Sequence, residues 1–351
     1  MKKICFFGIY DPEYSRNMVL RRALEENDFQ ILECNINPRI YHGLRKYTAL
    51  LEQFKKIKHE RFEYVIVCFP GHSVVWFARI LFGKRIIFDA FLSLYDSNVN
   101  DRKLYSCYHP RAWYDWFLDW SSCLLAWRVL IDTHQHAMYL SQSFFVPHNK
   151  IIRFLVSTDE TIFYPRTKSS NIRPYTVHFH GTYIPLQGIR YILDAAHILQ
   201  EEDIVFKLIG HGQEYSEMKS YAERLDLEKA KFMARVPLEE LPMYIANSDV
   251  CLGIFGSTEK AKRVIPNKVY EYAAMGKAVI TADTPAIREV FTHERNVILC
   301  TGGDGKAIAK AIFALKSNRG LAYQIGIGAR ELFEKKLKAK MLGEELLKEL
   351  K

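Results

Sequence analysis

Cysteine is sparse in this chain, and its few copies are scattered. Of the 351 residues seven are cysteines, an odd number with no C-x-x-C pair among them. Such a set is not typical of a disulfide framework, which needs even numbers at regular spacing. We therefore expect reduced thiols that mostly fill the core, and a cytoplasmic protein.

Long hydrophobic runs are missing as well. The opening MKKICFFGIY is broken by Asp11, Glu13 and Arg16, so it predicts a buried strand rather than a signal peptide. The longest later run, CLLAWRVLI, is interrupted by Arg128 and is less than half of what a bilayer span requires. The sequence thus predicts no transmembrane helix.

An excess of acidic charge is also absent. The formal net charge is +9, which favours an anionic partner such as a nucleotide, a phosphorylated substrate or an anionic lipid surface. A nucleic acid is not expected as a partner, because the basic residues are scattered and no RNP-like or helix-turn-helix pattern is visible.

What the chain does contain is a regular alternation of strand and helix patterns. Short apolar runs such as KKICFFGI, YVIVCF and RIIFDAF are separated by helical patterns, which is typical of a parallel sheet covered on both faces. The alternation breaks at FYPRTKSSNIRPY, residues 163–175, and then begins afresh. We predict an α/β protein with a first domain over residues 1–167, a second over 168–335, and a C-terminal helix, 336–351, that could return to the first domain.

Four polar or glycine-rich segments of the second half follow predicted strands. They are HGTYIPLQG (180–188), GHGQEY (210–215), GIFGSTEKAKRVIPNK (253–268) and TADTPAIRE (281–289). In an open parallel sheet, ligands bind at the carboxyl ends of strands, where loops and helix N-termini supply backbone N–H donors. The four segments in order within one domain predict a shared crevice.

Glu271 is the acidic residue of the helix predicted after the third of these segments. A carboxylate there could accept hydrogen bonds from both hydroxyls of a ribose in a nucleotide crevice. It could equally be an exposed helix residue paired with Lys268 or Lys277. The spacing alone leaves both interpretations open.

Residues 176–300 resemble the C-terminal, donor-binding domain of retaining GT-B glycosyltransferases of the large group 1 family. This family is similar to glycosyltransferase family four. The motifs follow the family's order: GTYIPLQGI with an LxAA helix, LIGxG, VPxEELPxYIAxSDV and IPNKVYEYAAMGKAVIT. In the first half only VLIDTHQH and FLVSTDETIFYP align. The resemblance implies a GT-B fold of two Rossmann-like, doubly wound domains facing across a cleft, with a nucleotide sugar on the second domain and an acceptor on the first.

The resemblance also implies a use for particular residues. Glu271 corresponds to the second glutamate of the family's E-x7-E motif, which binds the ribose of the nucleotide. The backbone of Val236 would meet the base, and Gly181 would let the backbone approach the diphosphate. The helix beginning near Asn267 would direct its N-terminal amides at the same phosphates. No metal and no other cofactor is expected.

The chain departs from the family at three positions. Arg263 stands where the first glutamate of the motif is expected, and Thr182 and Gln187 replace an arginine and a lysine that bind phosphate. A leaving diphosphate develops charge that needs stabilisation. We therefore expect Arg263 and Lys268 to serve as phosphate clamps, with Arg288 on the next loop. The alternative is that these residues are solvated surface charges.

The first half offers fewer candidates. Where the family often has a histidine after the fourth strand, this chain reads IIFDAFLSLYD. Asp89 could orient a substrate hydroxyl, or it could simply cap the loop at the strand end. His134, after a predicted N-cap at Thr133, is the second catalytic candidate. With His136 it does not indicate a metal site, because no third ligand at suitable spacing is evident.

Tryptophans gather in RAWYDWFLDWSSCLLAWRVL, residues 111–130. Trp113, Trp116, Trp120 and Trp127 lie largely on one face of a predicted helix. The stripe could face the core, or it could lie at the headgroup level of a membrane beside the neighbouring basic residues.

These features predict a hexosyltransferase-type enzyme that moves a sugar from a nucleoside-diphosphate sugar, with retention of anomeric configuration, to a glycan or lipid-linked acceptor. The expected setting is surface polysaccharide or glycolipid assembly, in the cytoplasm or at the inner face of the cell membrane, with peripheral contact to an anionic bilayer. The alternative, which the loss of the family's arginine, lysine and first glutamate leaves open, is a non-catalytic GT-B protein that binds a nucleotide sugar or a lipid.

Overall fold

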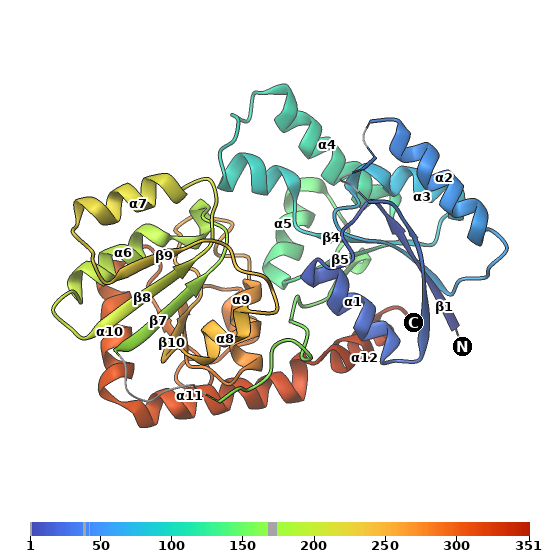
Figure 1. Cartoon of the computed structure of the whole chain (residues 1–351). Helices are drawn as coiled ribbons and strands as arrows, with labels where there is room; N and C mark the ends of the chain where they lie inside the picture. The colour runs from blue at the N-terminus through green and yellow to red at the C-terminus, as the bar shows by residue number, and fades with distance from the viewer. Residues whose placement is uncertain (1, 38–39, 42, 168–173) are drawn as a thin grey trace. The chain divides into compact units, whose positions relative to one another are not determined.

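The computed structural model of the protein describes residues 2–37, 40–41, 43–167 and 174–351 (Figure 1). The chain forms two compact units, one of Met1–Ser157 with Lys338–Lys351 and one of Thr158–Leu337. The boundary predicted at residue 168 lies outside the described residues, and the second unit already begins at Thr158.

The first unit is built on a parallel six-stranded sheet with the order β2-β1-β3-β4-β5-β6. Its strands read as continuous apolar runs because most of their residues are buried. The strands are β1 (Lys2–Gly8), β2 (Phe29–Asn35), β3 (Tyr64–Val67), β4 (Ile86–Phe91), β5 (Arg128–Ile131) and β6 (Ile151–Arg153). The helices are α1 (Ser15–Glu25), α2 (Arg45–Ile57), α3 (Val75–Phe82), α4 (Pro110–Leu125), α5 (His134–Phe144) and α12 (Ala339–Glu349), with short turns η1 (His72–Val74), η2 (Asp96–Asp101) and η3 (His148–Lys150).

The C-terminal helix α12 belongs to the first unit, where it packs on α1. Gly343 lies so close to the backbone oxygen of Ala23 that a Cβ would overlap it, so glycine permits this approach. The side-chain amide of Asn27 donates to the backbone oxygen of Lys340 at 3.0 Å. Close packing and this hydrogen bond together fix the end of the chain on the first sheet's helical layer.

The second unit is also a parallel six-stranded sheet, with the order β12-β11-β10-β7-β8-β9. Counted from β7, this is the strand order of the dinucleotide-binding fold, and it reverses between β7 and β10. The strands are β7 (Tyr175–His180), β8 (Ile204–Ile209), β9 (Ala230–Met233), β10 (Val250–Leu252), β11 (Val279–Ala282) and β12 (Ile298–Cys300). The helices are α6 (Ile189–Ile198), α7 (Tyr215–Arg224), α8 (Leu241–Ala246), α9 (Asn267–Ala274), α10 (Gly305–Ser317) and α11 (Arg319–Leu332), with short turns η4 (Pro185–Gln187), η5 (Ile287–Glu289) and η6 (Phe333–Leu337).

Helix α4 divides the predicted tryptophan stripe into parts with different environments. Trp116 and Trp120 are half-buried, stack with ring centroids 6.1 Å apart and pack against the core of the first unit. Trp113 is exposed, and Trp127 lies beyond the end of the helix. Within the described part of the chain, no helix is both long and apolar enough to cross a membrane.

Candidate functional site

The loops that follow β7 and β10 touch at the point where the strand order of the second unit reverses. A Cβ placed on Gly188, in the first loop, would come within 2.5 Å of the backbone nitrogen of Gly256, in the second. Gly188 also has a φ of 66°, which side chains disfavour. Glycine at this position therefore lets the two loops form one continuous surface at the place where such sheets bind ligands.

Lys268 lies in the first turn of α9 and is buried. Its Nζ contacts the side-chain oxygen Oε1 of Gln187 and lies 3.8 Å from the centroid of the Phe179 ring. A Cβ on Gly181 would come within 2.9 Å of the same Nζ, so glycine leaves room for the amine. The interpretation of Lys268 as a solvated surface charge is therefore wrong, because its amine points to the loop that carries Gly181 and Gln187.

Burial disfavours the protonated form of the Lys268 amine. Burial lowers the pKa of Lys268 well below its usual value of 10.5, and the nearby Glu271 carboxylate opposes this shift. An anion bound beside Nζ would favour the charged form by the same physics. The site can therefore gain a proton together with an anionic ligand.

Glu271 follows Lys268 by one turn of α9 and is also buried. Its Oε2 lies 2.7 Å from Nε2 of His180, the last residue of β7. The alternative of an exposed helix glutamate is therefore wrong. The carboxylate instead lies at the carboxyl end of β7, on the same side of the sheet as the loop after it.

His180 is held in turn by two further buried groups. Its Nδ1 lies 3.0 Å from Nε2 of His178 and 3.1 Å from the hydroxyl of Tyr272. Burial lowers the pKa of His178 well below its usual range and raises the pKa of Tyr272 well above its own, so both groups are neutral and either can donate. With Nδ1 of His180 accepting, Nε2 carries the proton and donates to Glu271.

The other residues predicted to bind the donor differ in exposure. Thr182 is exposed after Gly181, and Asn267 is the half-buried first residue of α9. Arg263 and Val236 are half-buried in the loops that precede α9 and follow β9. All four lie on segments that follow the carboxyl ends of strands.

Arg288 is engaged in an ion pair of its own. Its Nε and Nη2 donate to the two carboxylate oxygens of Asp283 at 2.5 and 2.6 Å. The Arg288 guanidinium lowers the pKa of Asp283, and both side chains lie at the surface. The cation predicted to serve a phosphate is thus already paired with a carboxylate.

Comparisons with known proteins agree with this geometry. Residues 174–318 match the model of the family described as glycosyl transferases group 1, and they include every donor-site residue named above. A relative from Haemophilus influenzae, an uncharacterized glycosyltransferase, is 25% identical over 175 residues, which are 48% of this chain and 47% of that protein. The chain thus spans about half the length of the curated relative it matches.

Solved structures extend the likeness to the whole chain. Sucrose-phosphate synthase from Thermosynechococcus elongatus matches with a TM-score of 0.77 at 15% identity, over 99% of this chain and 98% of that one. HepE of Anabaena, in complex with UDP and glucose, matches with a TM-score of 0.74 at 13% identity, over 100% and 99% of the two chains. The chain has the GT-B fold. The predicted fold class, with two Rossmann-like domains, is confirmed.

In the first unit of this GT-B fold, Asp89 belongs to a buried ion pair. Its two carboxylate oxygens lie 3.1 and 3.0 Å from Nε of Arg16, and Oδ1 also accepts from Nη2 at 2.7 Å. Both side chains are fully buried. Asp89 therefore joins β4 to α1 through this ion pair, in place of the alternative that it caps the loop at the strand end. A contact with substrate would require this ion pair to open.

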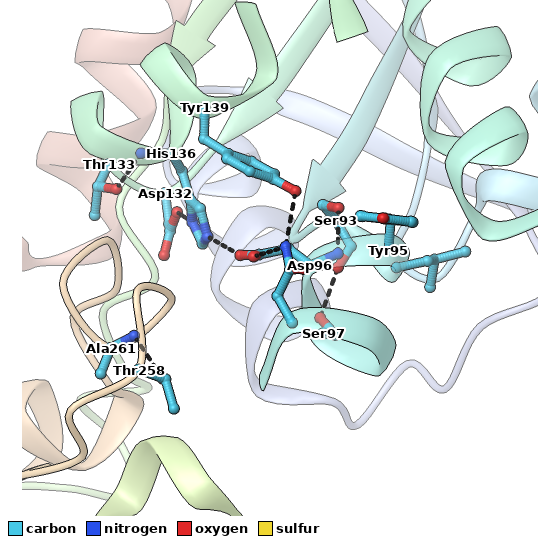
Figure 2. Close-up of polar contacts among 12 residues, drawn as sticks. Ser93, Tyr95, Asp96, Ser97, Asp132, Thr133, His136, Tyr139, Thr258 and Ala261 are labelled. Carbon is cyan, nitrogen blue, oxygen red and sulfur yellow. Dashed lines mark hydrogen bonds and ion pairs between the residues drawn. The ribbon is translucent and has the colours of Figure 1, made fainter. Parts of the chain in front are cut away.

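The two histidines that open α5 of the GT-B fold differ in environment. His134 is exposed, and Thr133 caps the helix as predicted, its hydroxyl accepting from the backbone nitrogen of His136 at 3.0 Å. His136 is buried, with Nδ1 2.5 Å from Asp132 and Nε2 4.0 Å from Asp96 (Figure 2). Over the described ranges no group of three or more His, Cys, Asp or Glu side chains is arranged to hold a metal.

Sequence reasoning missed the histidines behind Glu271. The segment TVHFHG was recognised only as a strand, yet His178 and His180 alternate with Phe179 and so share one face of β7. Two histidines on one face of a buried strand are costly unless they find partners. The two histidines on a buried face were therefore a sign in the sequence that polar partners exist. The sequence does not show which residues these are, because Glu271 and Tyr272 lie far along the chain.

Proposed function

We propose that the protein is a glycosyltransferase that takes a sugar from a nucleoside-diphosphate sugar. The observation that carries the proposal is that the amine of Lys268 contacts Gln187 and lies beside Gly181, where the strand order reverses. The domain that contains these residues matches the group 1 family. Buried beside them, Glu271 is held in a defined orientation by His180. An amine and a carboxylate one helical turn apart fit the diphosphate and the ribose of one nucleotide, and the amine gains its charge with the diphosphate.

Each residue then has a distinct task. Glu271 accepts hydrogen bonds from the ribose hydroxyls, and the backbone beside Val236 meets the base. Lys268, with Arg263 and the first amides of α9 at Asn267, stabilises the diphosphate as it leaves. These groups supply the positive charge that the reaction needs, so we propose transfer without a metal.

Lys268 also accounts for the most serious departure from the family pattern. The lysine expected at position 187 is a glutamine, but the side-chain oxygen of Gln187 contacts the amine of Lys268. An amine that can gain a positive charge with a bound diphosphate therefore reaches the same loop from a different element. This contact favours a functional donor site over the alternative of a non-catalytic GT-B protein, which rested on the loss of the family's arginine, lysine and first glutamate.

The proposal extends to the reaction and its acceptor. We propose hexosyl transfer with retention, in which the departing phosphate helps to deprotonate the acceptor hydroxyl, and we assign the acceptor to the first unit. A glycan or lipid-linked acceptor suits the basic net charge of +9 and a cytoplasmic enzyme of surface polysaccharide or glycolipid assembly. HepE was solved with UDP and glucose, which makes UDP-glucose the first donor to test.

The test is a thermal-shift titration with UDP, ADP, GDP and their sugars, without added metal. At one hundred times its dissociation constant, the correct nucleotide should raise the free energy of unfolding by about 2.7 kcal/mol. Glu271→Ala should abolish the shift, while Glu217→Ala, at an exposed position of α7, should retain it. A wild-type protein that responds to none of these ligands would overturn the proposal.

A further inference from the structure

Helix α4 buries both of its aspartates and leaves part of its aromatic residues exposed, which is unusual in a globular protein. Its two aspartates, Asp115 and Asp119, are buried, whereas Trp113, Tyr114 and Phe117 are 68%, 57% and 51% exposed. These three aromatic residues, with Leu124 two turns after Phe117, form a stripe at helical spacing on the solvent side. We call the exposed side chains of Trp113, Tyr114 and Phe117 the aromatic face.

The buried aspartates explain how the helix is held in this orientation. Asp119 accepts from Ser93 Oγ at 2.7 Å and from the backbone nitrogens of Leu94 and Tyr95 at 3.0 and 2.9 Å. Asp115 accepts from the side-chain amide of Asn98 at 2.8 Å. Polar contacts thus fasten one side of α4 to the segment after β4, and the aromatic face is left outside the core.

The aromatic face borders an open hollow of about 610 Å³. Tyr95, Cys107 and Trp116 line it together with the three exposed rings. The indole nitrogen of Trp113 donates to the backbone oxygen of Cys107 at 3.1 Å. Because that donor is already satisfied, the indole can enter an apolar phase without burying an unpaired N–H group.

The exposed charges of the segment that carries the aromatic face are of one sign. Lys103 and Arg111 are exposed, and over residues 102–125, all of them described, no carboxylate is exposed. Clustered exposed aromatic residues mark an interaction site, and aromatic side chains on a segment with exposed lysine and arginine fit the headgroup level of an anionic bilayer. A protein partner of mixed charge would not require that the exposed charges of this segment all be basic.

We propose that the aromatic face, with Lys103 and Arg111, docks the first unit onto an anionic lipid surface. Trp113, Tyr114 and Phe117 enter the interfacial layer, while the two cations meet lipid phosphates. The hollow gives the apolar chain of a lipid a place beside the rings. The inference rests on the proposed function only in that a lipid-borne acceptor gives the docking a use, and the surface can be tested without any donor.

The experiment measures sedimentation of the full chain with phosphatidylglycerol vesicles and with phosphatidylcholine vesicles. Wild-type protein should bind the anionic vesicles, and binding should weaken as salt is raised. Trp113→Ser combined with Phe117→Ser should weaken binding at least tenfold, while Tyr323→Ser, at an exposed position of α11, should not. Lys103→Glu combined with Arg111→Glu should act in the same direction, with Lys219→Glu on α7 as its control.

A fluorescent label on Cys107 provides an independent test of membrane contact by the same surface. All seven cysteines lie in the described residues, and Cys107 is the exposed one. An environment-sensitive fluorophore on its thiol should shift to the blue with phosphatidylglycerol vesicles and stay unchanged with phosphatidylcholine. Equal binding by wild type and both double variants would overturn the proposal. So would a wild-type dimer that the aromatic substitutions convert to monomer, because the face would then join two copies.

The variants also separate this proposal from the donor site. The aromatic double variant should keep its nucleotide-induced thermal shift, which shows in addition that it folds. Glu271→Ala should lose the thermal shift and still bind vesicles. Loss of vesicle binding in Glu271→Ala would count against docking through the aromatic face.

Discussion

The carboxylate oxygen Oε2 of Glu271 lies 2.7 Å from Nε2 of His180, which joins α9 to the end of β7. The two residues stand 91 positions apart in the sequence. His178 and Tyr272 fix the other side of the His180 ring, so the imidazole has one orientation in which it donates to Glu271. A carboxylate held in this way is preorganised for a ligand with two adjacent hydroxyls.

Replacing His180 should weaken nucleotide binding, although His180 acts through Glu271 and not by its own contact with the nucleotide. In His180→Ala the buried Glu271 loses its donor, which should cost about 1–3 kcal/mol in the free energy of unfolding. Nucleotide affinity should fall roughly tenfold, since the carboxylate is no longer oriented. Calorimetric titration of UDP measures the affinity. His180→Gln can still donate to Glu271 and should recover part of it, and His197→Ala, at an exposed position of α6, should behave as wild type.

Lys268→Met should separate stability from binding. The thioether side chain is similar in shape and has no charge to bury, so the melting temperature should stay the same or rise. Nucleoside-diphosphate affinity should fall at least tenfold, because the amine that meets the phosphates is gone. Lys262→Met, at an exposed position of the loop that precedes α9, is the matched control. Unchanged affinity in Lys268→Met would show that another group neutralises the diphosphate.

Binding of the diphosphate should be accompanied by proton uptake. The pKa of Lys268 is well below 10.5 in the folded protein because of burial, and a bound anion should raise it. Calorimetric titration in buffers with different ionisation enthalpies measures this uptake at pH 8. Wild type should take up protons and Lys268→Met should take up fewer. Identical uptake in the two proteins would refute the assignment.

The same shift has a definite sign for stability. Between the lowered folded pKa of Lys268 and 10.5, the unfolded chain binds more protons at this residue than the folded one. Above pH 10.5 the amine is neutral in both states, so its burial costs no stability. As the pH falls from 10.5 towards the folded pKa, the free energy of unfolding decreases. Comparison of wild type with Lys268→Met in urea unfolding at several alkaline pH values measures it, and the difference between the two should narrow as the pH rises.

Asp89→Asn should act on folding rather than on nucleotide binding. It leaves the fully buried guanidinium of Arg16 without its counter-charge, which should cost about 3–5 kcal/mol in the free energy of unfolding. Removal of both charges in Arg16→Met with Asp89→Asn should restore part of this loss. Denaturant unfolding measures all three variants. A stable Asp89→Asn protein that has lost only its transferase activity would instead restore the catalytic role.

The parts of the site that could be predicted are those with local causes. Gly181 and Gly188 stand out because tight turns after strands need glycine, and Glu271 stands out because its helix begins after such a loop. The sequence does not distinguish the exposed His134 from the buried His136, since nearby residues of one helix look alike without knowledge of which faces the core. Arg288 looked available because its pairing with Asp283 depends on the fold of the loop.

By itself the sequence determined the α/β alternation, the order of the motifs and the glycines at the loop turns, because periodicity and backbone conformation are set by neighbouring residues. Only the tertiary structure decided that Lys268 reaches Gln187, 81 positions earlier, and that His180 orients Glu271. It also decided that the aspartates of α4 face inward and its aromatic rings outward. Burial and the pairing of polar groups depend on contacts between segments that are distant in the chain, and these contacts set both the charge of Lys268 and the exposed surface of α4.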